Sequence, residues 1–290
     1  MDERTRYRTT VVRGQEIFYR EAGDPGAPVL LLLHGYPTSS HMFRDLIPRL
    51  ATRYRLVAPD HLGFGHSAMP SVNDFDYTFA NLAEITTAFT EQLGLSRFAM
   101  YVQDYGAPIG WRLAAAHPER VTAIVTQNGN AYLDGLDEDF WAPIRAYGAD
   151  PSPATEAPIR EFQTLDAIRW QYTHGVPDES LVSPDTWRHD FALLRRSGNA
   201  EIQLRLARDY ITNIDLYPVF QEYFRASQVP LLAAWGAHDE IFRPGGATAF
   251  QRDLPDAEIH LLPAGHFALE SHGAQIARLI DDFLGRNLPR

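Results

Sequence analysis

Short apolar runs that alternate with longer, helix-like segments are the feature of this 290-residue sequence that most restricts its fold. Residues 29–33 (VLLLL) form a continuous aliphatic run, which is typical of a strand buried on both faces of a sheet. Residues 7–12 and 16–21 instead alternate in polarity around Gly14, as the two strands of a hairpin do. We expect further strands at residues 55–58, 97–102, 121–126, 231–235 and 258–262.

Segments whose apolar residues recur at helical spacing separate these runs. They cover residues 40–51, 78–93, 107–116 and 274–284. Alternation of this kind predicts an α/β fold, with a mostly parallel, eight-stranded sheet and helices on both of its faces.

The alternation stops between residues 131 and 225, a stretch rich in Trp, Tyr and Pro. Its apolar residues keep helical spacing, and we expect helices at 141–147, 168–174, 191–196 and 202–210. The simplest organisation is a core domain of residues 1–130 and 226–290, with a helical cap of residues 131–225 inserted between two strands of one sheet.

Composition excludes several classes of function. A net charge of −11 and scattered Arg residues argue against a nucleic-acid-binding face. The chain has no Cys, so disulfides and thiolate nucleophiles are excluded, and its His residues lack the compact spacing of a metal site. No apolar run approaches the roughly 20 residues of a membrane helix, and the first ten residues lack the apolar stretch of a signal peptide. We therefore expect a cytoplasmic enzyme without metal, cofactor, membrane or nucleic-acid partner.

The segment around Asp104 (AMYVQDYGAPIG) carries the most chemical information. A predicted buried strand ends at Gln103, and a predicted helix follows Gly106 almost at once. A carboxylate on such a turn lies beside the helix N-terminus, whose amides stabilise developing negative charge. An Asp here is also a common helix N-cap. Taken alone, the segment favours capping and catalysis equally.

Three other loops follow predicted strands and carry polar side chains. They are His34-Gly-Tyr-Pro37, Trp235-Gly-Ala-His-Asp239 and Ala264-Gly-His266-Phe267. Together with the Asp104 turn they resemble the α/β-hydrolase fold, in the form found in epoxide hydrolases and haloalkane dehalogenases. The loop Asp60-His-Leu-Gly-Phe-Gly-His-Ser67 also resembles that family, and we expect it to be structural. Most members carry Ser within Gly-x-Ser-x-Gly, whereas here Asp104 replaces the Ser and Val102 the first Gly.

The resemblance implies a role for each matching residue. Asp104 is implied as the nucleophile, His266 as the general base and Asp239 as the acid that orients the imidazole. The backbone N–H groups of Tyr36 and Tyr105 are implied as the oxyanion hole. We expect the His34 imidazole itself to brace its loop, and His238 and Glu240 to have no catalytic role.

A carboxylate nucleophile narrows the reaction, because it attacks an sp³ carbon to form an alkyl-enzyme ester. His266 would then activate the water that hydrolyses this ester. Epoxides, alkyl halides and haloacids are the electrophiles that such chemistry suits. A non-catalytic ligand-binding protein on the same fold is the alternative from a different class, and retention of all three triad residues argues against it.

The leaving group distinguishes these substrates. In the resembling epoxide hydrolases two cap tyrosines protonate the alkoxide, and the matching residues here are Tyr172 and Tyr210, with Tyr217 in reserve. Halide release usually needs a Trp after the nucleophile and an Asn after His-Gly, where this chain has Tyr105 and Tyr36. Fluoroacetate-type relatives carry Arg where this chain has Tyr105 and Pro108. We therefore expect an epoxide hydrolase-like enzyme for a small apolar or amphipathic substrate, with dehalogenation as the alternative and a homo-oligomeric state left open.

Overall fold

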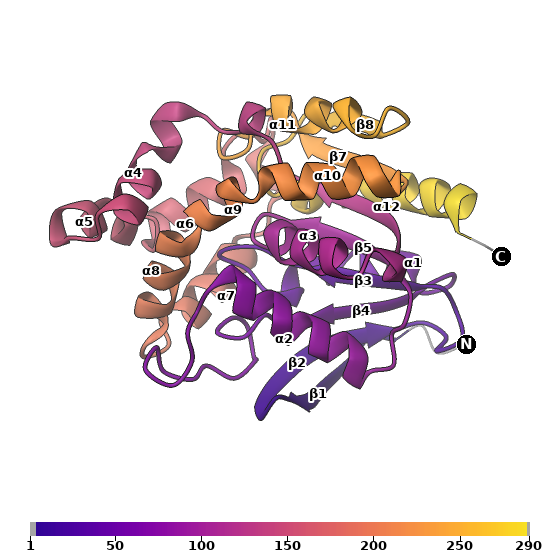
Figure 1. Ribbon diagram of the computed structural model, residues 1–290, viewed down its shortest axis with the longest axis horizontal. Helices are drawn as coiled ribbons and strands as arrows, with labels where there is room; N and C mark the ends of the chain where they lie inside the picture. The colour runs from indigo at the N-terminus through magenta and orange to yellow at the C-terminus, as the bar shows by residue number, and fades with distance from the viewer. Residues whose placement is uncertain (1–3, 289–290) are drawn as a thin grey trace.

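Eight strands form a single sheet of order β1-β2-β4-β3-β5-β6-β7-β8 in the computed structural model, which describes residues 4–288 (Figure 1). The strands are β1 (Arg6–Val12), β2 (Gln15–Ala22), β3 (Val29–Leu33), β4 (Arg55–Pro59), β5 (Phe98–Gln103), β6 (Val121–Gln127), β7 (Leu231–Gly236) and β8 (Glu258–Leu262). β1 pairs antiparallel with β2, and β2 with β4, whereas the remaining neighbours are parallel. The predicted α/β fold with a mostly parallel, eight-stranded sheet is therefore confirmed. Residues 1–3 and 289–290 of the expected core domain lie outside the described residues.

Helices cover both faces of the sheet, which explains the uninterrupted apolar runs. Leu31 and Leu33 of β3 belong to the core beneath α2 (Phe79–Gln92) and α3 (Gly106–Ala116). Leu30 and Leu32 belong to the opposite core, beneath α12 (Ala268–Asn287). Because neighbouring side chains of a strand point to opposite faces, every residue of a strand between two helical layers is buried.

Two of the core helices differ from the sequence-based expectation. The segment 40–51 forms a 3-10 turn, η1 (Ser40–Phe43), and the short helix α1 (Ile47–Leu50), instead of one helix. Pro48 lies in the first turn of α1, where its missing N–H removes no helical hydrogen bond. Helix α12 begins six residues earlier than 274, and non-helical backbone at His272 marks a kink within it. A further short helix, α11 (Pro244–Ala249), precedes β8.

The stretch between β6 and β7 is helical, and its helices α4 to α8 gather at the end of the sheet opposite the two termini (Figure 1). The helices are α4 (Glu138–Ala149), α5 (Pro153–Glu161), α6 (Leu165–Thr173), α7 (Pro184–Leu194), α8 (Asn199–Asp209), α9 (Ile211–Asp215) and α10 (Tyr217–Ser227). We refer to residues 131–225 as the cap; the domain boundary itself stays a prediction. Sequence analysis did not predict α5, α9 or α10; α5 contains Pro158 in its interior, and the first turn of α10 contains Pro218. Within residues 4–288, no helix has the length and apolar character needed to span a membrane.

Candidate active site

A tight turn between β5 and α3 presents Asp104 at the carboxyl end of the sheet. Asp104 has a φ of 47°, in the left-handed region that non-glycine residues seldom adopt. Gly106 makes the turn possible, because a Cβ there would lie 2.2 Å from the Leu33 carbonyl oxygen. The helix-capping interpretation is wrong: the N-cap of α3 is Tyr105, and the α3 amide of Ala107 bonds the Asp104 backbone carbonyl rather than its carboxylate.

Two backbone N–H groups converge on one oxygen of Asp104. The N–H groups of Tyr36 and Tyr105 donate to Oδ1, with N···O distances of 2.7 and 2.6 Å. Gly35 allows this close approach, since a Cβ at that position would lie 2.3 Å from the Asp104 Cβ. The two amides implied as an oxyanion hole are thus brought together, and they already hold one carboxylate oxygen.

His266 and Asp239 complete the cluster from the loops that follow β8 and β7. His266 Nδ1 lies 2.9 Å from Asp239 Oδ2, and His266 Nε2 lies 3.7 Å from Asp104 Oδ2. All three side chains are buried, with residue exposures of 6% for Asp104, 4% for Asp239 and 3% for His266. The carboxyl ends of parallel strands meet at one edge of a sheet, which is why residues far apart in the chain come together here.

Two polar residues that sequence analysis did not select hold this cluster in place. The Gln103 amide donates to His266 Nε2 at 2.9 Å. The Asn128 amide donates to Asp239 Oδ2 at 2.7 Å, and the Ile241 N–H donates to the other Asp239 oxygen at 2.8 Å. With Nδ1–H directed at Asp239, His266 Nε2 carries the lone pair, which accepts from the Gln103 amide in this structure. A polar residue at the end of an otherwise buried strand was the available signal for both.

Burial and neighbouring charges shift the pKa values of Asp104 and His266. Burial raises the pKa of Asp104, while His266 and the N–H groups of Tyr36 and Tyr105 oppose that rise. Burial by itself would lower the pKa of His266, but the charge and hydrogen bond of Asp239, together with Asp104, raise it above the ordinary value. Asp239 therefore makes His266 a stronger base than a free imidazole.

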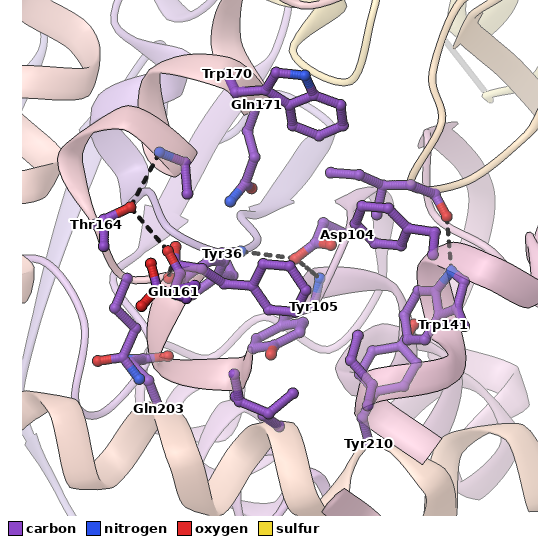
Figure 2. Close-up of a pocket in the computed structure, with 18 residues that line it drawn as sticks. Tyr36, Asp104, Tyr105, Trp141, Glu161, Thr164, Trp170, Gln171, Gln203 and Tyr210 are labelled. Carbon is purple, nitrogen blue, oxygen red and sulfur yellow. Dashed lines mark hydrogen bonds between the residues drawn. The ribbon is translucent and has the colours of Figure 1, made fainter. Parts of the chain in front are cut away.

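A cavity of about 430 Å³ opens above Asp104 between the core and the cap (Figure 2). Its lining residues are mostly aromatic or aliphatic; they are Tyr36, Asp104, Tyr105, Phe140, Trp141, Ile144, Ile159, Glu161, Phe162, Gln163, Thr164, Ala167, Trp170, Gln171, Gln203, Ala207, Tyr210 and Ile241. None of these lining residues is Lys, Arg or His. The described residues also contain no group of three or more His, Asp or Glu side chains placed to hold a metal ion.

Of the three candidate cap tyrosines, Tyr210 lines the cavity, whereas Tyr172 and Tyr217 do not. Tyr210, at the end of α8, lines the cavity together with Tyr105 and Tyr36, and the rings of Tyr105 and Tyr210 are 5.8 Å apart. The Tyr36 hydroxyl donates to the Phe162 carbonyl oxygen at 3.0 Å, which ties this core loop to the cap. Tyr217 lies behind Tyr210 and contacts its hydroxyl.

The expectation that Tyr172 faces the nucleophile is wrong. Its ring stacks on Phe267, with centroids 4.0 Å apart, and its hydroxyl donates to the buried carboxylate of Asp190. Tyr172 is therefore part of the contact between α6, α7 and the core, outside the cavity. The residue before it in the chain, Gln171, reaches the cavity instead, because neighbouring residues of a helix point about 100° apart.

Residues expected to be structural are held by backbone groups. His34 Nδ1 contacts the Gly35 carbonyl at 2.9 Å, and its Nε2 accepts from the His61 N–H at 3.0 Å. The Asp60 carboxylate accepts from the backbone N–H groups of Ser40 and His66. His238 and Glu240 also lie outside the cavity lining; Glu240 contacts His174 at 2.9 Å.

Comparison with known proteins gives consistent matches over nearly the whole chain. Residues 28–273 match the family model described as the alpha/beta hydrolase fold. An uncharacterized hydrolase of Saccharomyces cerevisiae is 43% identical over 285 residues, covering 97% of each chain. A haloalkane dehalogenase of Mesorhizobium japonicum is 41% identical, covering 92% of this chain and 87% of its own. The crystal structure of haloalkane dehalogenase DbeA from Bradyrhizobium elkani superposes with a TM-score of 0.80 at 21% identity, covering 98% of both chains.

Substitution of Tyr172 tests its placement outside the cavity. We expect Tyr172→Phe to change enzymatic turnover less than about twofold, because Tyr172 lies outside the cavity and its hydroxyl bonds to Asp190. It should lower the free energy of unfolding by about 1–3 kcal/mol, because the buried Asp190 loses a hydrogen-bond donor. Urea unfolding and initial rates measure the two effects, with the exposed Tyr7→Phe as control. A large loss of turnover with an unchanged free energy of unfolding would contradict this placement and indicate a catalytic role for Tyr172.

Proposed function

This protein belongs to the α/β-hydrolase family, and we propose that it is a hydrolase that uses Asp104 as a covalent nucleophile. One observation carries the proposal: Asp104 Oδ1 is held by two backbone N–H groups while Oδ2 faces His266 at 3.7 Å. A Ser nucleophile would need the imidazole to remove its proton, whereas an ionised carboxylate attacks without one. The imidazole is then available for the second step.

In the first step, Oδ2 of Asp104 attacks an electrophilic sp³ carbon of the substrate. The new Oδ2–C bond forms as the bond from that carbon to the leaving group breaks, and the leaving group departs with the electron pair. Oδ1 becomes the carbonyl oxygen of the ester and keeps its N–H donors from Tyr36 and Tyr105. The negative charge thus moves from Asp104 to the leaving group.

In the second step, water attacks Cγ of the ester while His266 Nε2 removes its proton. The negative charge develops on Oδ1, where the Tyr36 and Tyr105 N–H groups stabilise it. Collapse of this intermediate breaks the Cγ–Oδ2 bond, and the departing alkoxide takes its proton from the His266 imidazolium. The second water proton stays on the new carboxyl group of Asp104, which loses it to solvent to regenerate the carboxylate. The product leaves with the original Oδ2, and Asp104 keeps one oxygen from water. The Gln103 amide, now bonded to Nε2, must release it to the water.

The donors around the cavity favour an epoxide as the electrophile. An opened epoxide leaves an alkoxide on the product, which needs an acidic proton, and Tyr210 and Tyr105 both line the cavity with their rings 5.8 Å apart. The Tyr210 hydroxyl donates to Tyr217 in this structure and would turn its proton toward the alkoxide. Burial, with the charge of Asp104, raises the pKa of both tyrosines well above the ordinary value, so both stay protonated. The Trp141 indole N–H donates to the Ile241 backbone carbonyl at 2.8 Å, so a halide would have to displace that hydrogen bond.

Haloalkane dehalogenation is the second candidate, and sequence similarity favours it. The 41% identity to a haloalkane dehalogenase of Mesorhizobium japonicum is the supporting observation. Both candidates use the same alkyl-ester chemistry and differ in what receives the leaving electron pair. A haloacid is less suited, because the cavity lining provides no cation for a carboxylate.

Trapping of the ester tests the nucleophile. In His266→Gln the first step should proceed and the second stall, so intact-protein mass spectrometry should show one substrate adduct, mapped to the peptide that contains Asp104. Asp104→Asn should form no adduct and should lose at least about 1,000-fold in turnover, the scale seen when a nucleophile is removed. His238→Gln, a matched change in the Asp239 loop, should turn over without adduct. Absence of an adduct with every epoxide and haloalkane tried would contradict the proposal.

Removal of the two hydroxyls distinguishes the leaving groups. Tyr210→Phe should lower kcat/KM for epoxides by about 10²-fold, the usual contribution of a positioned general acid, and Tyr105→Phe should lower it to a similar or smaller degree. Neither change should lower halide release, since a halide needs no proton. Parallel assays of diol formation and of bromide release measure this. Equal losses in both assays, or a loss only in bromide release, would exclude epoxide opening as the function of these tyrosines.

A further inference from the structure

Stacked aromatic rings form the wall of the cavity on the cap side. The Phe140 ring stacks on Phe162, with centroids 5.9 Å apart and planes 18° apart, and on Trp170, at 6.2 Å and 17°. These rings come from α4, α6 and the segment between α5 and α6. They provide a flat apolar surface for the body of a substrate, but such a surface discriminates little between apolar groups of similar size.

Gln171 interrupts this apolar wall. Its side chain extends from α6, next to Trp170, into the cavity on the side toward Tyr36 (Figure 2). Gln171 is only 7% exposed, yet its carboxamide forms no hydrogen bond with any residue in the described range 4–288. The oxygen and nitrogen of the Gln171 carboxamide are accessible from the cavity. They therefore differ from polar atoms such as Gln203 Oε1, which lack a partner and are fully covered by neighbouring atoms. A buried amide without a partner is costly unless a ligand or water satisfies it.

Most of the other buried or half-buried polar groups of the cavity have hydrogen-bond partners, whereas Glu161 is an exposed carboxylate. The hydroxyl of Tyr36 bonds to the cap backbone, and the indole N–H of Trp141 bonds to Ile241. The two other cavity glutamines differ from Gln171. Gln163 Nε2 donates to the Ala200 carbonyl at 3.4 Å, whereas Gln203 Nε2 donates to Asn199 Oδ1 at 3.2 Å and Gln203 Oε1 is sealed from the cavity. Gln171 is therefore the free amide that can recognise a substrate away from the leaving group.

We propose that Gln171 binds a neutral oxygen of the substrate, and that the substrates are uncharged epoxides with an ether, carbonyl or hydroxyl oxygen between the reacting carbon and an apolar tail. The identity of the reacting group rests on the proposed function; the recognition by Gln171 does not. A carboxamide both donates and accepts, so it suits each of these oxygen groups. A carboxylate is disfavoured, because the lining offers no cation and Glu161 adds a negative charge.

Binding of two product-like diols tests this recognition without any turnover. 3-Phenoxypropane-1,2-diol and 4-phenylbutane-1,2-diol differ only by an ether oxygen in place of a methylene. The wild type should bind the ether diol about five- to tenfold more tightly, the range expected for one net hydrogen bond. Quenching of the fluorescence of Trp141 and Trp170, which line the cavity, provides the Kd values. Gln171→Leu should abolish the preference, and Gln203→Leu should retain it.

The Kd values of the two diols show whether Gln171 recognises the ether oxygen. An equal Kd for the two diols in the wild type, or a preference that survives Gln171→Leu, would overturn the proposal. A preference lost in Gln171→Leu supports it, provided that Gln171→Leu unfolds at the same urea concentration as Gln203→Leu. If the diol preference behaves as expected while the corresponding epoxides are not turned over, the proposed reaction fails and the recognition site remains.

Discussion

Two backbone N–H groups on one carboxylate oxygen are the interaction on which the site depends. The turn that makes it possible puts Asp104 at a φ of 47°, a conformation that costs about 1–3 kcal/mol for a residue with a side chain. Hydrogen bonds to a charged oxygen contribute about 1.5–3 kcal/mol each, which offsets that strain. Gly35 and Gly106 leave the space for the turn to close. With Oδ1 fixed in this way, Oδ2 is the oxygen left to react.

A line of hydrogen bonds then sets the protonation of the base. Asn128 and Ile241 orient Asp239, Asp239 receives Nδ1–H of His266, and Gln103 contacts the opposite nitrogen. The imidazole is thereby held in the tautomer that accepts a proton at Nε2. The core supplies all of these groups. The cap supplies Tyr210 and Gln171, so in the proposed mechanism the nucleophile and the base come from the core, whereas the proposed acid and the proposed substrate-recognition residue come from the cap.

The sequence predicted the core better than the cap for a physical reason. A buried parallel strand needs an unbroken apolar run and an antiparallel hairpin an alternating one, and all eight predicted strands are present in the structure. Likewise, Asp104, Asp239 and His266 follow strand ends, and strand ends converge whatever the details of packing. Cap helices are specified by contacts with each other, and α5, α9 and α10 were not predicted. The direction in which a cap side chain points is harder to predict than the helix itself. Gln171 and Tyr172 are neighbours in α6, yet Gln171 lines the cavity and Tyr172 lies outside it. Gln103 and Asn128 were missed because their role lies in a hydrogen bond that only the fold creates.

The origin of the oxygen in the product is the most direct test of the account. With enzyme in excess over substrate in ¹⁸O-water, one turnover should give a product without ¹⁸O, because its new oxygen is Oδ2 of Asp104. The ¹⁸O should appear in the peptide that contains Asp104, since water attacks Cγ of the ester. A product that carries ¹⁸O after the first turnover, with Asp104 unlabelled, would mean that water attacks the substrate directly, and would contradict a covalent role for Asp104.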